Sequence, residues 1–82
     1  MYPSPQFLSL LVLFPPLRPG DRVIRGPDWM WGSQGDGEEG VVQYVKDWKG
    51  IPQKGVRVRW DNGEGNMYRY GAENCYDVVE SN

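Results

Sequence analysis

Two tryptophans and a set of arginines are the residues of this chain whose types and spacing suit ligand recognition. Trp29 and Trp31 lie two residues apart in the segment RGPDWMWG, where glycine and proline would otherwise predict a solvated loop. Residues two apart in an extended chain point to one face, so both indoles should face one way and Met30 the other. The segment therefore has two interpretations: an aromatic patch that binds a ligand, or indoles that hold a glycine-rich loop on a small core.

Residues typical of catalysis, phosphate binding or metal binding are sparse. The segment GDGEEG (35–40) has the spacing of a dinucleotide-binding loop, but the strand-like VVQYV follows it instead of a helix, and its three carboxylates would repel phosphate. Cys75 is the only cysteine and there is no histidine, which leaves no disulfide, no cysteine–histidine zinc site and no base for a thiol nucleophile. The oxygen pattern of an EF-hand loop is absent. The sequence predicts a domain that is not an enzyme and has no cofactor.

Large side chains are the means of stability left to so short a chain. Its 82 residues form one domain, and a domain of this size buries only about 60% of the surface that the unfolded chain exposes. Four Trp, five Tyr and two Phe are present, and each buried aromatic contributes about 4–6 kcal/mol of gross transfer free energy. At least one of Trp29, Trp31 and Trp60 should therefore be core. The net charge of −2 disfavours nucleic acid as a partner.

Short strands separated by glycine dominate the chain after Pro19. In VRVRW (56–60), apolar residues alternate with Arg57 and Arg59, which is the pattern of a half-buried strand with arginines on its outer face. Asn62-Gly63 suits the turn of a hairpin, whose return strand carries Tyr68, Arg69 and Tyr70. Further strands are predicted over 21–25 and 41–45 and near Val79, with a loop over 46–55. Closure of about five strands removes exposed edges, so we expect an all-β fold, a small SH3-like barrel.

The first eighteen residues differ from the rest. An apolar run, Phe7 to Phe14, is closed by Pro15-Pro16 and is far shorter than the ~20 residues of a membrane span, so we expect no membrane insertion. A signal peptide is disfavoured because no Lys or Arg precedes the run. We expect residues 1–18 to be a tail that is disordered, rests on an apolar patch or is foreign to the native domain; if ordered, 7–14 would add an edge strand. Residues 19–80 form the predicted domain.

Taken together, GDRVIRGPDWMWGSQGDGEEGVV and VRVRWDNGEGNMYRYGAENCYDV closely resemble the MIB/HERC domain, named for the mind bomb and HERC ubiquitin ligases. The resemblance covers residues 19 to about 80 and implies an SH3-like β-barrel. The sequence departs from the family where the usual Gln-Asp-Gly-Gly becomes Gln34-Gly35-Asp36-Gly37. It also has Asn74 where a glycine is usual, and asparagine is the other residue that tolerates a left-handed backbone.

The resemblance implies a non-catalytic module that recruits substrates for a multidomain E3 ubiquitin ligase in the cytoplasm. In mind bomb proteins, a pair of such domains flanks a ZZ zinc finger and recognises the cytoplasmic tails of Notch ligands. The implied partner is a protein or peptide, with Notch-ligand tails and Notch signalling as the first candidates. Any zinc would lie in neighbouring domains, and the isolated domain should be a monomer.

Two sets of residues follow from the pattern and the resemblance. The candidates for peptide binding are Trp29, Trp31, Arg57, Arg59, Tyr68 and Arg69. The residues with a structural role are Gly26, Asp28, Trp60, Asp61, Gly63, Gly71, Tyr76 and Asp77. Two other functions stay open: a scaffold that packs against neighbouring domains, and a Tudor-like reader of methylated peptides, which needs three or four rings around an open space. Exposure of the tryptophans distinguishes recognition from scaffolding.

Overall fold

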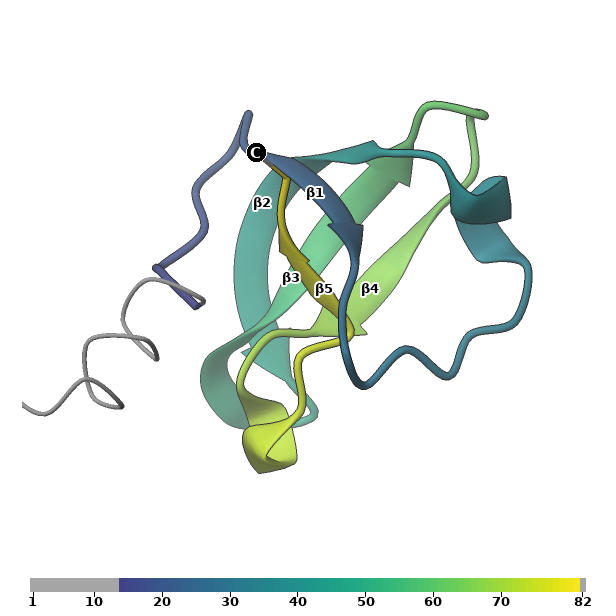
Figure 1. The fold of residues 1–82 in the computed structure, drawn as a ribbon. Helices are drawn as coiled ribbons and strands as arrows, with labels where there is room; N and C mark the ends of the chain where they lie inside the picture. Colours follow the sequence, from purple (N-terminus) through teal and green to yellow (C-terminus); the bar gives the residue numbers. More distant parts are fainter. Residues whose placement is uncertain (1–13, 82) are drawn as a thin grey trace, which may run out of the picture.

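The structure, a computed structural model, describes residues 14–81, so the predictions for the apolar run before Phe14 lie outside the described residues. Figure 1 shows the described chain as strands and two short 3-10 helices, which confirms the all-β class and the five strands. No helix in this part of the chain is long and apolar enough to cross a membrane. The elements are β1 (Arg22–Arg25), η1 (Gln34–Gly37), β2 (Gly40–Trp48), β3 (Ile51–Trp60), β4 (Gly65–Arg69), η2 (Ala72–Asn74) and β5 (Val78–Glu80).

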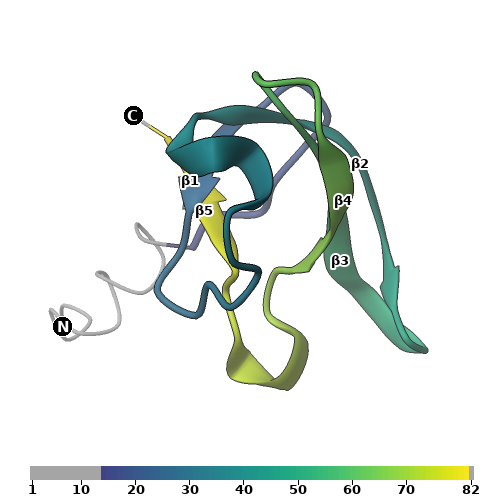
Figure 2. The same cartoon turned by 90° about the vertical axis from the view of Figure 1, so that its right-hand side faces the viewer.

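The five strands form one antiparallel sheet in the order β4-β3-β2-β1-β5. Figure 2 shows the sheet bent so that β1 and β5 lie across from β3 and β4. The prediction of a closed barrel is wrong, because β4 and β5 are not paired as strands. They approach at one corner, through an isolated bridge between Tyr70 and Tyr76 and a hydrogen bond of 3.0 Å from Asp77 N–H to the Arg69 carbonyl. The likeness to an SH3 fold stays a prediction.

The β2–β3 hairpin corrects the loop predicted over 46–55. Lys49 and Gly50 form a two-residue turn with φ of 44° and 85°, and Trp48 pairs with Ile51. Positive φ at both positions is the type I′ geometry that matches strand twist. Pro52 is tolerated because β3 extends there beyond β4, whose pairing ends at Gly55, so no partner strand needs its missing N–H.

The predicted β3–β4 hairpin is confirmed. Gly63 has a φ of 96°, as a turn glycine should, and the Trp60 N–H donates to the Glu64 carbonyl at 2.7 Å. The next turn contains Gly71 with a φ of 100° and Asn74 with a φ of 58°. Asparagine thus adopts the left-handed conformation that the resemblance implied at this position.

Trp60 is the largest side chain of the core, with 1% of its surface exposed, as predicted. Its indole Nε1 donates to the Tyr68 hydroxyl at 2.8 Å, so the one polar atom of the ring is satisfied. A Cβ on Gly35 would lie 2.5 Å from the Trp60 ring. Close packing against this ring therefore explains why the first position of GDGEEG is glycine. The buried apolar residues are Leu17, Val23, Val42, Val56, Val58, Trp60, Tyr68, Tyr70, Ala72 and Val78.

Residues Phe14 to Leu17, assigned to the tail, pack on this core. Leu17 is 7% exposed, and Phe14 stacks on Tyr76. The Tyr70 hydroxyl donates to the Pro15 carbonyl. Packing on an apolar patch, one of the interpretations of the tail, therefore describes Phe14, Pro15 and Leu17, whereas Pro16 is exposed.

Candidate functional site

The loop between β1 and η1, which carries RGPDWMWG, is fastened to the chain just before β5. Asp28 does this twice: its carboxylate accepts the Tyr76 N–H at 2.7 Å, and its own N–H donates to the Tyr76 carbonyl at 3.2 Å. A Cβ on Gly26 would lie 2.3 Å from that same carbonyl, so the close approach requires glycine there. Asp28, one of the residues assigned a structural role, thus ties the loop through backbone hydrogen bonds.

Trp29 holds the loop against the core. Its ring meets Trp60 edge-on at a centroid distance of 5.6 Å and lies 5.3 Å from Tyr68. Its Nε1 donates to the Gly32 carbonyl at 3.0 Å, and the Arg25 guanidinium sits 4.7 Å above the ring. Trp29 is half-buried with its polar atom and one face already occupied, so its first role is in folding.

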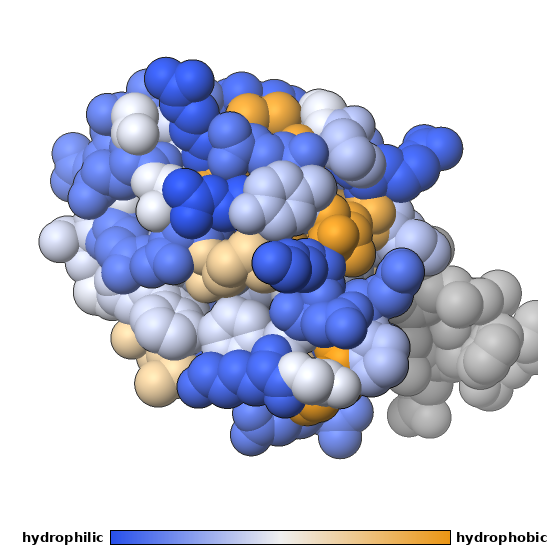
Figure 3. Space-filling view, turned by 180° about the vertical axis from the view of Figure 1, so that it is seen from behind, coloured by the Kyte–Doolittle hydropathy of each residue, from blue (hydrophilic) through white to orange (hydrophobic). Residues whose placement is uncertain are grey.

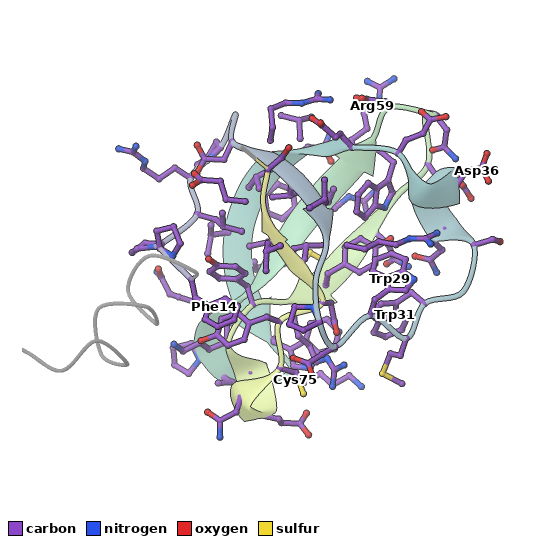
Figure 4. All side chains as sticks on the ribbon, viewed as in Figure 1. Phe14, Trp29, Trp31, Asp36, Arg59 and Cys75 are labelled. Atoms are coloured by element: carbon purple, nitrogen blue, oxygen red, sulfur yellow. The ribbon has the colours of Figure 1, made fainter. Side chains whose placement is uncertain are left out.

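Trp31 lies next to Trp29 on the same loop (Figure 4) and is also half-buried. It meets Tyr68 at 6.1 Å and Trp48 at 6.4 Å, both edge-on. Its indole Nε1 is buried and has no hydrogen-bond partner among residues 14–81. Trp31 thus reaches from the core to the surface.

Trp31 and Trp48 border a surface hollow of about 330 Å³, here called the Trp31–Trp48 groove. Met67 adds a flexible apolar side chain to it, and Lys49 Nζ lies 5.5 Å from the centroid of the Trp48 ring. Met67 pairs with Arg57, so it lies on the outer face of the sheet. Figure 3, a view from behind, shows small apolar areas between polar side chains on that face of the molecule. The groove is lined by Trp31, Asp47, Trp48, Lys49, Asn66 and Met67.

The other predicted binding residues are not brought to this groove. Tyr68 has no exposed surface, so the prediction that it contacts a ligand is corrected: it is a core residue. Arg57 Nε donates to the Gln43 side chain at 3.3 Å. Arg59 is exposed near the turn after β3, away from both labelled tryptophans (Figure 4).

Arg69 forms an ion pair within the fold. Asp77 is fully buried, and its carboxylate accepts the Arg69 backbone N–H at 2.9 Å, Nε at 2.9 Å and Nη2 at 2.7 Å. Burial alone would raise the pKa of Asp77, but the hydrogen bonds from Arg69 outweigh it and hold that pKa below its usual value. The Arg69 side chain is 13% exposed. It pairs with a carboxylate of its own domain and not with a ligand.

The residues assigned structural roles lie at turns and contacts. The Asp61 carboxylate accepts a hydrogen bond from Arg22 Nη1 at 3.1 Å. The backbone N–H of Asp61 donates to the Glu39 carbonyl at 2.8 Å. Tyr76 supplies backbone atoms to the RGPDWMWG loop and its ring to Phe14.

Sequence reasoning missed Trp48, because 46–55 was interpreted as a loop. The signal was present in Lys49-Gly50, a dipeptide that suits a tight hairpin turn between two runs of strand-forming residues. With Trp48 included, two aromatic rings line the groove. A cage for a methylated side chain needs three or four, so the groove does not favour the Tudor-like interpretation. Among residues 14–81, no three Cys, Asp or Glu side chains are grouped as metal ligands.

Comparison with known proteins gives consistent matches. The family model Mib_herc2 matches residues 20–81. The chain is 42% identical over 78 residues, 92% of its length, to the E3 ubiquitin-protein ligase mind-bomb of Drosophila melanogaster. It is 42% identical over 64 residues, 73% of its length, to the E3 ubiquitin-protein ligase MIB2 of Gallus gallus. It is 40% identical over 60 residues, 72% of its length, to the E3 ubiquitin-protein ligase HERC2 of Homo sapiens. The matches span 6%, 7% and 1% of these three relatives.

Proposed function

We propose, from the premise that this chain belongs to the Mib_herc2 family of domains found in E3 ubiquitin ligases, that it is a non-catalytic module which binds a peptide segment of a ligase substrate. The observation that carries the proposal is the Trp31–Trp48 groove. The domain supplies recognition, and ubiquitin transfer belongs to other parts of such a ligase.

The groove has the chemistry of a peptide-binding surface. Tryptophan is enriched among the residues that dominate binding energy, because a rigid ring covers much area at little entropic cost. Met67 is unbranched and adapts to the shape of an apolar side chain. Trp31 is fixed from behind by Tyr68, and Trp48 by the two-residue turn. The two rings are therefore held in place before a ligand arrives, which lowers the cost of binding.

The charge around the groove favours an acidic partner. The β2–β3 hairpin carries three exposed lysines, and none forms an ion pair within residues 14–81. Lys49 lines the groove, whereas Lys54 borders a different hollow of the same hairpin. The one carboxylate there, Asp47, accepts the Gln53 N–H at 3.0 Å. The local charge is thus positive although the chain has a net charge of −2. A peptide with an apolar anchor flanked by Asp or Glu would complement this surface.

Cytoplasmic tails of Notch ligands are the first substrates to test, since two of the matched relatives are the mind-bomb and MIB2 ligases. A domain that meets such tails acts in the cytoplasm. The chain labelled with nitrogen-15 should be titrated with tail peptides while the indole N–H signals of Trp31 and Trp48 are followed by NMR. Binding in the groove shifts both signals in a saturable way.

Trp48→Ala should weaken this binding at least about 30-fold, the cost of removing a central aromatic anchor. Tyr44→Ala is the matched control, because Tyr44 is an exposed aromatic of the same strand outside the groove. Lys49→Glu should weaken binding of acidic peptides and leave an uncharged analogue unchanged. If no tail peptide shifts either indole signal at millimolar concentration, the domain is a scaffold between its neighbours and the proposal fails.

A further inference from the structure

A second apolar surface lies on the other side of the molecule from the labelled tryptophans, where Phe14 is found (Figure 4). Tyr70 and Tyr76 form it, with ring centroids 5.1 Å apart and planes at 87°. The chain's own Phe14-Pro15-Pro16 lies on this surface. Phe14 stacks on Tyr76 at 3.8 Å with an interplanar angle of 17°, and the Tyr70 hydroxyl donates to the Pro15 carbonyl.

These contacts are those by which proline-rich segments are recognised. Consecutive prolines fix φ near −65° and lack N–H groups, so the chain stays extended and its carbonyls remain free to accept hydrogen bonds. Surfaces that bind such segments supply aromatic rings for the side chains and a donor for a carbonyl. Tyr76 supplies the ring and Tyr70 the hydroxyl donor. The surface therefore has the chemistry for a segment with the order aromatic–Pro–Pro.

The segment and the surface beneath it are separable. The family match begins at residue 20, so Tyr70 and Tyr76 belong to the matched domain while Phe14-Pro15-Pro16 lies outside it. Leu17, 7% exposed, is the point where the segment joins the core, and the Arg18 N–H fastens the chain beyond it to the Asp21 carboxylate at 2.9 Å. Phe14 and Pro15 are half-buried and Pro16 is exposed. Release of residues 14–16 would thus not require Leu17 to leave the core.

The segment also leaves part of the surface uncovered. A hollow of about 210 Å³ lies between Phe14, Pro16 and Leu17 on one side and the β2–β3 hairpin on the other. Val45 and Val56 form its apolar wall, and the side of Lys54 borders it. A ligand longer than the chain's own three residues thus finds an additional apolar contact there.

We propose that the Tyr70–Tyr76 surface binds proline-containing segments of the type aromatic–Pro–Pro, and that Phe14-Pro15-Pro16 occupies it in this chain as an exchangeable internal ligand. Such a segment of another protein competes with the internal one. This surface is separate from the Trp31–Trp48 groove and does not depend on its function. A tethered segment acts at an effective concentration in the millimolar range, so the internal ligand weakens binding of an external one.

The test uses the full chain and the peptide VLFPP, which copies residues 12–16, with blocked ends. Phe14→Ala removes the stacked ring of the internal ligand and should tighten binding of VLFPP at least about tenfold. Ring signals of Tyr70 and Tyr76 report binding by NMR. In the Phe14→Ala chain, Tyr70→Phe removes the donor to the proline carbonyl and should weaken binding several-fold. Tyr44→Phe is the matched control, because Tyr44 is exposed and does not line this surface or its hollow, and it should change nothing.

The peptide VLFGG lacks the prolines and VLAPP lacks the aromatic ring, so they distinguish specific recognition of each feature from non-specific hydrophobic binding. Both should bind at least tenfold more weakly than VLFPP. The proposal is overturned if VLFPP gives no saturable shifts at millimolar concentration with a folded Phe14→Ala chain, or if VLFGG binds as well. Should Phe14→Ala fail to fold, the unaltered chain decides the question. Excess VLFPP should then abolish the nuclear Overhauser contacts between Phe14 and Tyr76. If these contacts persist at saturating peptide, the proposal that the internal segment is exchangeable is overturned.

Discussion

Replacing Asp77 with asparagine is expected to lower the free energy of unfolding by about 3–5 kcal/mol, the usual cost of breaking a buried ion pair from one side. The carboxylate is fully buried and accepts three N–H groups of Arg69, at 2.9, 2.9 and 2.7 Å. Asparagine has nearly the same shape but carries no charge, and its amide would leave the largely buried guanidinium of Arg69 without a counterion. A small domain is stable by about 5–15 kcal/mol, so the variant should be close to unfolding at 37 °C.

The pH dependence gives the prediction a signature beyond a loss of stability. The folded-state pKa of Asp77 is lowered, so the charged carboxylate stabilises the fold fully above its unfolded pKa of about 3.9. That contribution is lost as the pH falls through the folded-state pKa. The unaltered chain should therefore lose more stability on acidification below about pH 4 than the Asp77→Asn variant does. Urea unfolding followed by tryptophan fluorescence, from pH 7 down to pH 2.5, measures both quantities.

Asp61→Asn is the matched control, because that carboxylate also pairs with an arginine but about half of its side chain is exposed. Its removal should cost much less, since water screens an exposed pair. Equal losses for Asp77→Asn and Asp61→Asn at pH 7, or an unchanged acid dependence in Asp77→Asn, would refute the view that the buried pair joins β4 to the chain before β5.

Three further substitutions test the packing around the central indole. Trp60→Ala should lower the free energy of unfolding by about 3–5 kcal/mol by leaving a core cavity, and an unchanged thermal midpoint would contradict the burial of this ring. Gly35→Ala and Gly37→Ala both place alanine at a φ near 75°, but only at Gly35 does the new Cβ meet the Trp60 ring, at 2.5 Å. Chemical denaturation should thus show an additional loss of about 1–3 kcal/mol for Gly35→Ala over Gly37→Ala, and equal losses would show that the ring yields freely.

The sequence predicted the elements whose signals are local. Alternation in VRVRW and the Asn62-Gly63 turn define the β3–β4 hairpin, because a period of two and a glycine at positive φ are both visible in a short window. Trp60 in the core followed from the same alternation. Asp28 was expected to have a structural role, and its contacts with Tyr76 are those that short carboxylates commonly make with backbone N–H groups beside turns.

Features that depend on contacts between distant residues were not predictable. The pairing of Arg69 with Asp77 joins an outer-face arginine to the far edge of the sheet, and nothing in either local pattern identifies the partner. Trp48 was missed because Gly50, Pro52 and Gly55 resemble the breakers of a loop, whereas the turn occupies only Lys49 and Gly50. The binding surface was placed partly on Tyr68, since alternation assigns a face but does not reveal that a tryptophan loop covers it.

The RGPDWMWG loop also affects whether copies of the domain can pair through their sheet edges. The β4 edge would otherwise present free N–H and C=O groups to any extended chain. Asp77 accepts the outward N–H of Arg69, and the Asn66 side chain accepts that of Met67 at 2.8 Å. The Gln34 side chain reaches across to Asn66 at 3.4 Å, which keeps the tryptophan loop along the same edge. With β5 only three residues long, the other rim is short as well, and both features disfavour edge-to-edge pairing between neighbouring copies of the domain.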